Sequence, residues 1–276
     1  MKFRAKMVDG ACIKQFMSIV GTMAKLGKTC AIRITTEEMC FIIHEAQSLA
    51  TSPMVWCAIA KDHLFLEFDM EGLNSVDNEI LLEFESDNVS RVSSSKVSSS
   101  AKSVKIKLTK KRVPCLTFEI DLPSENSRSR LVVHDIPVNL ISRRLWGEYQ
   151  QPDDPGADIR LVPPPLRVLR NIVERMKHLA NMATVYFNKD GDMSITAETS
   201  MVSVTSHFEN LQIDSYDQHE CSVTLDLKKF STLLLTDQLS PNRVTCSGTA
   251  DKSLHFSLQS DSFVLQYILP AVSQGI

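Results

Sequence analysis

The chain has 276 residues, 43% hydrophobic and 23% charged, with a formal net charge of −3. No apolar run approaches the ~18 residues of a membrane span, and no apolar segment follows the charged start, so neither a membrane protein nor a secretory signal is expected. Seven scattered cysteines form no C-x-x-C pair, which predicts a reducing compartment, cytosol or nucleus, without disulfides or a zinc site.

Segments that alternate apolar and polar residues predict a protein made mostly of strands. In the first half they cover residues 2–8, 30–35, 78–85, 104–109, 116–122 and 131–138. Apolar residues at three- and four-residue spacings predict an amphipathic helix over residues 10–28. A shorter helix is predicted over residues 87–97 with Ser86 as its cap, although the serine run from Ser93 to Ser103 also fits a loop.

The second half repeats this order. A helix is predicted over residues 165–180 and a shorter one over 227–235, with Asp226 as its cap. Strands are predicted over residues 183–188, 193–199, 201–208, 221–227, 243–248, 254–259 and 263–269. Asp190-Gly191 predicts a hairpin turn, since Asp-Gly supplies the positive φ of tight turns.

Between the halves, residues 139–158 contain Pro152, Pro155 and Gly156, which resist both helix and strand and indicate a linker. We therefore expect an α+β fold of two tandem units, each with two helices packed on antiparallel sheets. The expected bounds are residues 1–138 for the first unit, 139–158 for the linker and 159–276 for the second unit.

Positive charge gathers on the predicted helices, which together carry about +7 within a chain of −3. One basic helix would fit an ordinary solvated face, but two equivalent ones favour a surface for phosphates. These faces lack aromatic residues, which disfavours single-stranded nucleic acid and favours the backbone of duplex DNA, contacted without reading its sequence. The residues expected to face DNA are Lys14, Lys25, Lys28, Arg91, Arg167, Arg170, Arg175 and Lys177.

The stretch GTMAKLGKT (residues 21–29) is close to a phosphate-binding loop, G-x-x-x-x-G-K-[ST], but five residues separate Gly21 from Gly27 instead of four. Such a loop follows a strand and opens a helix, so that helix N–H groups hold the phosphates. Here Gly27 is expected to close a helix. A nucleotide site is therefore disfavoured.

Other patterns for chemistry also fail. FNKDGDMSITAE (residues 187–198) has its glutamate seven residues after the glycine, where a calcium loop needs six, and its flanks are strands. The seven histidines form no H-x-x-x-H pair, and no serine lies in G-x-S-x-G. We expect no catalytic residue, no metal and no cofactor.

A duplicated α+β unit with basic helices and many strands resembles a DNA sliding clamp of the PCNA type. Narrower similarities lie in MKFRAK at the start, Trp56-Cys57, FDMEG (68–72), NEILLEFE (78–85), KIKLTKK (105–111), PCLT (114–117), VVHDIP (132–137), RRLW (143–146), IVERMK (172–177) and LQYILPA (265–271). In this order they resemble the Hus-type subunits of the nine-one-one checkpoint clamp, over essentially the whole chain.

The resemblance implies a non-catalytic subunit that joins two other clamp-like subunits in a heterotrimeric ring. A clamp loader would place the ring on double-stranded DNA at damage sites in the nucleus, and the cytoplasm would be an additional location of the subunit. There it would serve checkpoint and repair proteins, in mitosis, meiosis or both.

The resemblance also implies where such subunits join, namely by pairing of strand edges. Bare edges with alternating side chains are templates for another chain. The implied interface residues are Leu131, Val133, His134, Ile136, Met201, Val202, Val204 and His207. Partner peptides in the replication clamp dock under the linker, which implies a groove at Leu140, Ile141, Trp146, Tyr267 and Pro270, although Trp146 also fits a residue that pins the linker to the sheet.

Three alternatives remain at this point. A homotrimeric replication-type clamp would share the fold. A P-loop nucleotidase would need ATP binding that depends on Lys28, and a duplicated protein that reads DNA sequence would need side chains aimed at base edges.

Overall fold

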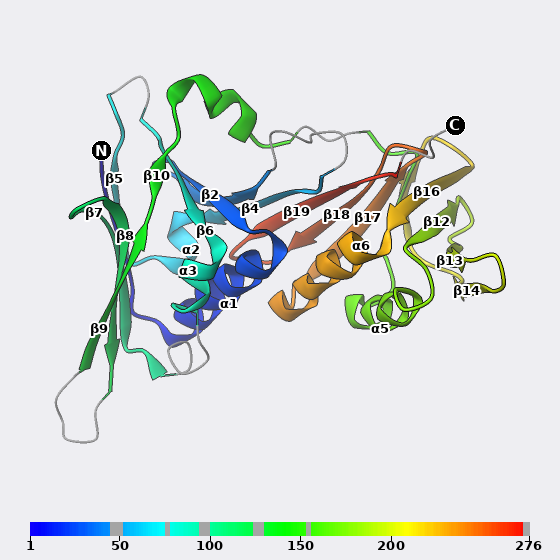
Figure 1. Ribbon diagram of the computed structural model, residues 1–276, viewed down its shortest axis with the longest axis horizontal. Helices are drawn as coiled ribbons and strands as arrows, with labels where there is room; N and C mark the ends of the chain where they lie inside the picture. Colours follow the sequence, from blue (N-terminus) through cyan, green and yellow to red (C-terminus); the bar gives the residue numbers. More distant parts are fainter. Residues whose placement is uncertain (45–51, 75–77, 94–99, 124–129, 153–155, 273–276) are drawn as a thin grey trace. The chain divides into compact units, whose positions relative to one another are not determined.

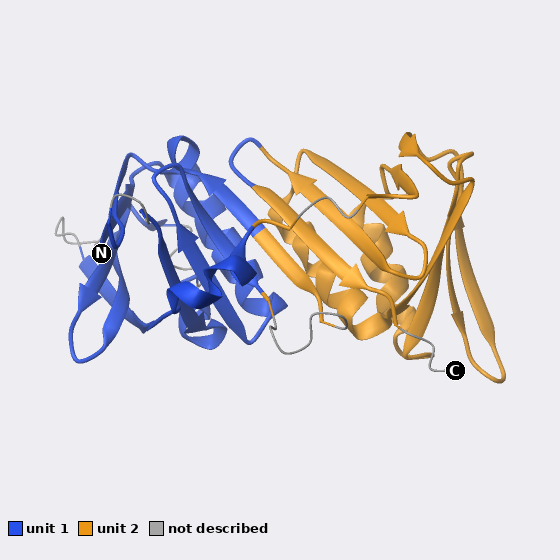
Figure 2. Ribbon diagram, turned by 90° about the horizontal axis from the view of Figure 1, so that it is seen from above, with its two compact units in different colours: residues 1–43, 57–150, 261–263 blue, residues 44–56, 151–260, 264–276 orange. Residues whose placement is uncertain are grey.

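The computed structural model describes residues 1–44, 52–74, 78–93, 100–123, 130–152 and 156–272. The chain forms two compact units. Unit 1 comprises residues 1–43, 57–150 and 261–263, and unit 2 comprises residues 44–56, 151–260 and 264–276 (Figure 2). Within the described residues, no helix combines the length and hydropathy that crossing a membrane requires.

The first half of the chain builds two antiparallel sheets and a long helix (Figure 1). One sheet has the strand order β5-β1-β7-β8-β9, and another set of neighbours has the order β10-β6-β2-β3-β4. The elements are β1 (Lys2–Met7), α1 (Gly10–Leu26), β2 (Thr29–Ile34), β3 (Glu38–Ile43), β4 (Met54–Ala60), α2 (Lys61–Leu64), β5 (Glu67–Glu71), β6 (Ile80–Glu85), α3 (Ser86–Ser90), β7 (Ser103–Lys110), β8 (Pro114–Leu122), β9 (Arg130–Pro137), β10 (Asn139–Leu140) and the 3₁₀ helix η2 (Arg143–Tyr149).

The second half is built in the same way. Its strands have the orders β15-β11-β17-β18-β19 and β14-β13-β12-β16. The elements are β11 (Ile159–Leu161), α5 (Leu166–Met176), β12 (Met182–Asn188), β13 (Met193–Glu198), β14 (Ser203–Phe208), β15 (Ile213–Tyr216), β16 (Glu220–Asp226), α6 (Leu227–Leu233), the 3₁₀ helix η3 (Leu234–Leu239), β17 (Arg243–Thr249), β18 (Ser253–Gln259) and β19 (Val264–Pro270).

The two halves share one topology. The order β5-β1-β7-β8-β9 recurs as β15-β11-β17-β18-β19, and β6-β2-β3-β4 recurs as β16-β12-β13-β14. Each long helix follows the first strand of its half, and the short helices α3 and α6 each follow the sixth. The repetition seen in the sequence is therefore a repetition of topology as well as of composition.

The long helices bury the predicted apolar stripes. In α1 the buried stripe includes Ile13, Phe16 and Val20, which pack towards β2, β3 and β7. The Asp9 carboxylate caps α1 by accepting hydrogen bonds from the backbone N–H groups of Ala11 and Cys12, which satisfies two of the N–H groups that a helix start leaves unpaired.

The short helices fit the sequence prediction unequally. Asp226 caps α6 as predicted, since its carboxylate accepts from the N–H groups of Lys228 and Lys229. The prediction for residues 87–97 was wrong in its start, because α3 begins at Ser86 itself, whose side chain is buried and whose N–H donates to the Lys28 carbonyl. Residues 94–97 of that predicted helix lie outside the described residues.

The predicted linker is more ordered than proline and glycine indicated. Residues 139–150 contain β10 and η2, and Tyr149 at the end of η2 is only 8% exposed. The irregular part begins after this anchor, and residues 153–155 lie outside the described residues.

All seven cysteines are free thiols, and every one except Cys12 is buried. The six buried thiols act as small hydrophobic side chains in the core.

Candidate nucleic-acid interface and subunit edges

The cations expected to face DNA in unit 1 are on the surface. Lys14 and Lys25 of α1 are exposed, as are Lys28 just after α1 and Arg91 just after α3. Residues 10–28 contain no carboxylate. The exposed side of α1 therefore keeps a positive field that a phosphate backbone could use.

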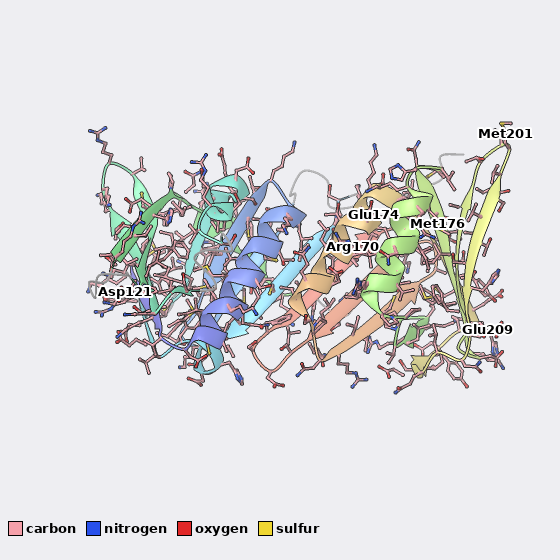
Figure 3. The ribbon with its side chains drawn as sticks, turned by 90° about the horizontal axis from the view of Figure 1, so that it is seen from below. Asp121, Arg170, Glu174, Met176, Met201 and Glu209 are labelled. Carbon is pink, nitrogen blue, oxygen red and sulfur yellow. The ribbon has the colours of Figure 1, made fainter. Side chains whose placement is uncertain are left out.

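In unit 2 the predicted cations fall into two groups. Arg167 and Arg175 of α5 are exposed. Arg170, labelled in Figure 3, forms an ion pair with Asp237 of η3, and Lys177 lies 2.8 Å from Glu174 and donates to the Ser231 hydroxyl of α6. Arg170 and Lys177 therefore hold α5 against α6 and η3, and their charges are offset within the unit.

Glu174 joins the same contact between helices. Its carboxylate accepts hydrogen bonds from Lys177 and from the Ser231 hydroxyl. These two donors lower the pKa of Glu174 below its usual value because they stabilise the ionised form. Glu174, Lys177 and Ser231 thus link the C-terminal end of α5 to α6.

Lys228 is one further candidate. In residues 226–238, Lys228 and Lys229 are balanced by Asp226 and Asp237, so the net charge of the segment does not reveal it. Asp226 is used as the helix cap and Asp237 is paired with Arg170, while Lys228 is exposed. A lysine in the first turn of a helix meets the positive end of the helix dipole, so stability does not explain its position. The sequence already indicated that Asp226 caps the helix. Leaving this carboxylate out of the charge count would have revealed Lys228.

The near-match to a phosphate-binding loop is explained by packing. Gly21 lies inside α1, where an added Cβ would be 3.1 Å from the Ser93 hydroxyl oxygen, and Gly27 follows the helix, where a Cβ would lie 2.6 Å from Ile43 Cγ2. Thr29 then opens a strand. Both glycines permit close approach to a neighbouring element, and the order of elements is the reverse of that in a nucleotide-binding loop.

The near-match to a calcium loop is a hairpin between β12 and β13, as predicted. Gly191 has φ +89, and a Cβ there would collide with the Leu211 carbonyl. Asn188 organises the turn by accepting from the N–H groups of Asp190 and Asp192. Across the part of the chain that the structure describes, no group of three or more His, Cys, Asp or Glu could hold a metal ion.

Strand β9 lies at the edge of its sheet, paired with β8 on one side. Leu131 and Val133 are 62% and 46% exposed, and His134 is half-buried. Ile136 is an exception to the predicted interface set, because its side chain is only 3% exposed and packs inside unit 1. The edge therefore offers its backbone and one apolar row.

Strand β14 lies at the edge of its sheet in unit 2, next to β13. Val204 is half-buried and His207 is exposed. The predicted strand started too early, because Met201 and Val202 belong to the turn before β14, closed by the Thr199–Val202 backbone hydrogen bond. Met201 is 91% exposed at the tip of this hairpin (Figure 3).

The groove residues do not form a uniform apolar set. Leu140 is 50% exposed, and Ile141 and Trp146 are partly exposed. The Trp146 indole N–H donates to the Ile141 carbonyl at 3.1 Å, and the Ile141 N–H donates to the Leu81 carbonyl of β6. Trp146 thus pins η2 to the sheet, which was the alternative role considered for it.

In unit 2, Pro270 is half-buried, but Tyr267 is only 1% exposed. The expectation that Tyr267 lines a groove was therefore wrong. Its strand alternates, and the ring occupies the helix-facing side beside its register partner Phe256. Burial raises the pKa of its phenol, as expected where the charged form loses water.

Known proteins resemble the chain over nearly its whole length. It is 38% identical to human "Checkpoint protein HUS1" over 99% of this chain and 100% of that protein. It is 34% identical to Drosophila melanogaster "Checkpoint protein Hus1-like", with 99% of each chain covered. Identity to the Dictyostelium discoideum "Checkpoint protein hus1 homolog" is 24%, again over 99% of both chains.

The fold is also found among solved structures. The crystal structure of Proliferating Cellular Nuclear Antigen from Entamoeba histolytica matches with a TM-score of 0.72, covering 98% of each chain at 15% identity. The predicted sliding-clamp fold is thereby confirmed. Residues 1–273 match the family described as Hus1-like protein, and with the identities above this shows that the chain belongs to the Hus1-like family, which is not a family of enzymes.

Proposed function

We propose that the chain is a non-catalytic subunit of a heterotrimeric ring-shaped DNA clamp, loaded at damaged DNA, that acts as a platform for checkpoint signalling and repair. One observation carries this proposal. A member of a family whose relatives are named checkpoint proteins has the sliding-clamp fold, with exposed cations on the equivalent long helices of both halves.

The mechanism we propose is topological. A ring that surrounds a duplex stays on it without tight binding, so weak contacts between exposed Lys or Arg side chains and phosphates suffice. Such contacts weaken as salt concentration rises and do not depend on base sequence. The exposed cations Lys14, Lys25, Lys28, Arg91, Arg167 and Arg175 would provide them, whereas Arg170 and Lys177 would mainly support α5.

We propose that neighbouring subunits join through β9 and β14. Both are edge strands, and an edge presents unpaired N–H and C=O groups that a strand of another chain can satisfy. The apolar row of Leu131 and Val133 on β9 and the turn with Met201 and Val202 before β14 would supply side-chain contacts. The proposed domain bounds, 1–138, 139–158 and 159–276, place one such edge in each unit.

Further parts of the proposal concern partners. Two clamp-like subunits, a clamp loader and double-stranded DNA are expected, together with repair and checkpoint proteins in the nucleus. A peptide groove beside Leu140 and Ile141 stays in the proposal, while Tyr267 is removed from it because its side chain is buried.

Co-purification of the tagged full chain from cells tests the proposal, with mass spectrometry to identify what accompanies it. We expect two other clamp-like proteins in equal amounts, and their absence would contradict a heterotrimer. Light scattering on the isolated chain separates the second candidate, a homotrimeric replication-type clamp, whose fold this chain shares. A stable homotrimer would favour that candidate.

A further inference from the structure

The edge strand β9 carries an apolar row on the outer face of its sheet. Leu131 and Val133 are 62% and 46% exposed, and they point away from the core because the alternate residues of the strand include buried Ile136. The residues opposite them on β8 are Asp121, labelled in Figure 3, and Glu119. The apolar row is therefore bordered by carboxylates on its own sheet, and a strand added at the open edge is what could cover it.

The edge strand β14 has the opposite character. Its outward row is Ser203, Thr205 and His207, which are exposed, while the alternate residues of the strand are half-buried. The register partners of this row on β13 are also polar, and the hydroxyl oxygens of Thr196 and Thr205 lie 3.0 Å apart. Strand β14 therefore offers hydrogen-bonding groups where β9 offers apolar surface.

Exposed apolar side chains next to β14 lie in the turn that precedes it. Met201 and Val202 are 91% and 53% exposed. Figure 3 labels Met201 just before β14 and Glu209 just after it, at opposite ends of the strand. The apolar contact that the outer side of this edge can make is thus at the N-terminal end of β14.

These positions do not match in a joint between two copies of this chain. Neighbouring strands in both sheets pair antiparallel, and an added strand that continues the sheet keeps outward residues opposite outward residues. Leu131 and Val133 would then lie against the polar row of β14 in every register that pairs the two strands. The Met201 turn would lie beside the C-terminal end of β9, where Asp135 and Lys111 form an exposed ion pair.

Such a mismatch is unfavourable for both strands. Leucine and valine side chains gain free energy when they lose contact with water. Hydroxyl and imidazole groups covered by them, however, would lose hydrogen bonds to water without replacement. Specificity between partners arises from unfavourable contacts of this kind as well as from favourable ones. The two edges of this chain therefore oppose pairing with one another.

We propose that the two edges select different partner strands and that neither accepts a second copy of this chain. The strand that joins β9 carries apolar side chains on its outward row. The strand that joins β14 carries a polar outward row and an apolar side chain near its C-terminal end, beside the Met201 turn. This inference rests on the proposed joining of subunits through β9 and β14, and it adds the chemistry of each partner's edge.

The first test asks whether changing one row creates self-association. Two full-length copies with different tags are co-expressed, and one tag is captured. The unchanged chain should not retain its second copy. The edge variant Thr205→Val, His207→Leu makes the outward row of β14 apolar and should retain it. The affinity between copies should rise at least about tenfold, because burying one such side chain is sufficient for that gain.

A matched control changes the same two rows one strand further from the edge. Thr196 and Ser194 of β13 are the register partners of Thr205 and His207. The control variant Ser194→Leu, Thr196→Val introduces the same apolar side chains and removes the same contact between Thr196 and Thr205, but it should not retain a second copy. Adding Leu131→Asp to the edge variant should abolish its self-association, which separates strand pairing from non-specific aggregation.

A second measurement uses the partner subunits and does not depend on the folding of the edge variant. Each clamp-like protein found by co-purification is co-expressed alone with this chain. Leu131→Thr, Val133→Thr, which changes two exposed positions, should weaken binding to one partner and leave the other unaffected. The edge variant, where it folds, should weaken binding to the other partner.

The possible failures are distinguishable. Self-association of the unchanged chain overturns the inference, as do an edge variant that behaves like its control and a β9 variant that binds both partners normally or neither. If the unchanged chain brings no two clamp-like proteins from cells, the proposed function fails. If it brings both and the edge variant retains no second copy, this inference alone fails.

Discussion

Arg170 of α5 and Asp237 of η3 form an ion pair in which the guanidinium Nη1 lies 3.2 Å from both carboxylate oxygens. The Asp237 side chain is 16% exposed and the Arg170 side chain 33%. The pair links two elements of unit 2 that are 67 residues apart in sequence. Arg170, which the sequence predicted to face DNA, therefore takes part in the packing of α5 against η3.

The first prediction concerns this pair. Arg170→Ala should lower the free energy of unfolding by roughly 1–3 kcal/mol, because it leaves the mostly buried Asp237 carboxylate without this partner. Arg167→Ala removes an exposed arginine of the same helix and should change it by less than about 0.5 kcal/mol. Urea denaturation of both variants measures the difference, and equal effects would show that the ion pair does not support the fold.

The second prediction concerns DNA. The triple variant Lys14→Ala, Arg167→Ala, Arg175→Ala should weaken duplex binding by the assembled complex. It should also lower the salt dependence, by about 0.9 in the log–log slope for each phosphate that is no longer neutralised. Fluorescence anisotropy at several salt concentrations measures both quantities.

A charge-matched control keeps the second prediction specific. Lys110→Ala, Lys189→Ala, Lys252→Ala removes three exposed lysines from a strand end and two turns, and should leave DNA binding almost unchanged. If the two triple variants lose affinity equally, the effect reflects net charge and the helices have no special role. Both should still assemble with partner subunits.

The third prediction concerns the β9 edge. Leu131→Asp should weaken association with a partner subunit, because a carboxylate replaces an apolar side chain at a strand edge. The fold itself should tolerate the change, since Leu131 is 62% exposed. Leu66→Asp is the matched control, being 64% exposed next to β5 at the other edge of the same sheet. Pull-down of co-expressed subunits would contradict the assignment if both variants bound equally well.

The fourth prediction separates Gly10, the first residue of α1, from Gly27, which follows its last residue. Gly27→Ala should destabilise the chain by about 1–3 kcal/mol, because the new Cβ would lie 2.6 Å from Ile43 Cγ2 in a well-packed region. Gly10→Ala meets nothing within 4 Å at the helix start and should be neutral or slightly stabilising. Thermal unfolding distinguishes them, and a neutral Gly27→Ala would mean that Ile43 moves aside easily.

The fifth prediction concerns acid stability. Because the pKa of Glu174 is lowered in the folded chain, the ionised carboxylate contributes stability above the unfolded pKa of about 4.3 and loses that contribution as pH falls through the folded value. Glu174→Gln should therefore lose less stability than the unchanged chain between about pH 5 and pH 3. Denaturant midpoints at several pH values measure this, with exposed Glu198→Gln as the control expected to follow the unchanged chain.

Much of the fold was predictable because local signals and tertiary packing agree. The stripe through Ile13, Phe16 and Val20 indicated α1, and Asp226 marked the start of α6. The strands β3 and β4 show no alternation, since all their residues are buried except Glu38, Met54, Ala58 and Ala60. A continuous apolar run fits a buried strand or a buried helix equally.

The candidate site was less predictable, for a physical reason. The sequence shows which residues are charged, but not which of them meet a partner that is distant in the sequence. Lys177 and Ser231 are 54 residues apart and meet only because α5 packs on α6. Tyr267 lies on the same side of its strand as buried neighbours. Whether that side faces the helices or solvent depends on which elements pack against the sheet.

The burial of the cysteines has a consequence for oxidation. Thiols react with oxidants as thiolates. Burial raises the pKa of Cys30 and of Cys221 to about 12, and raises those of Cys40, Cys57 and Cys246 as well, so almost no thiolate forms at neutral pH. The buried thiols are therefore poor targets for oxidants, while the most exposed methionine, Met201, is where oxidation would act first.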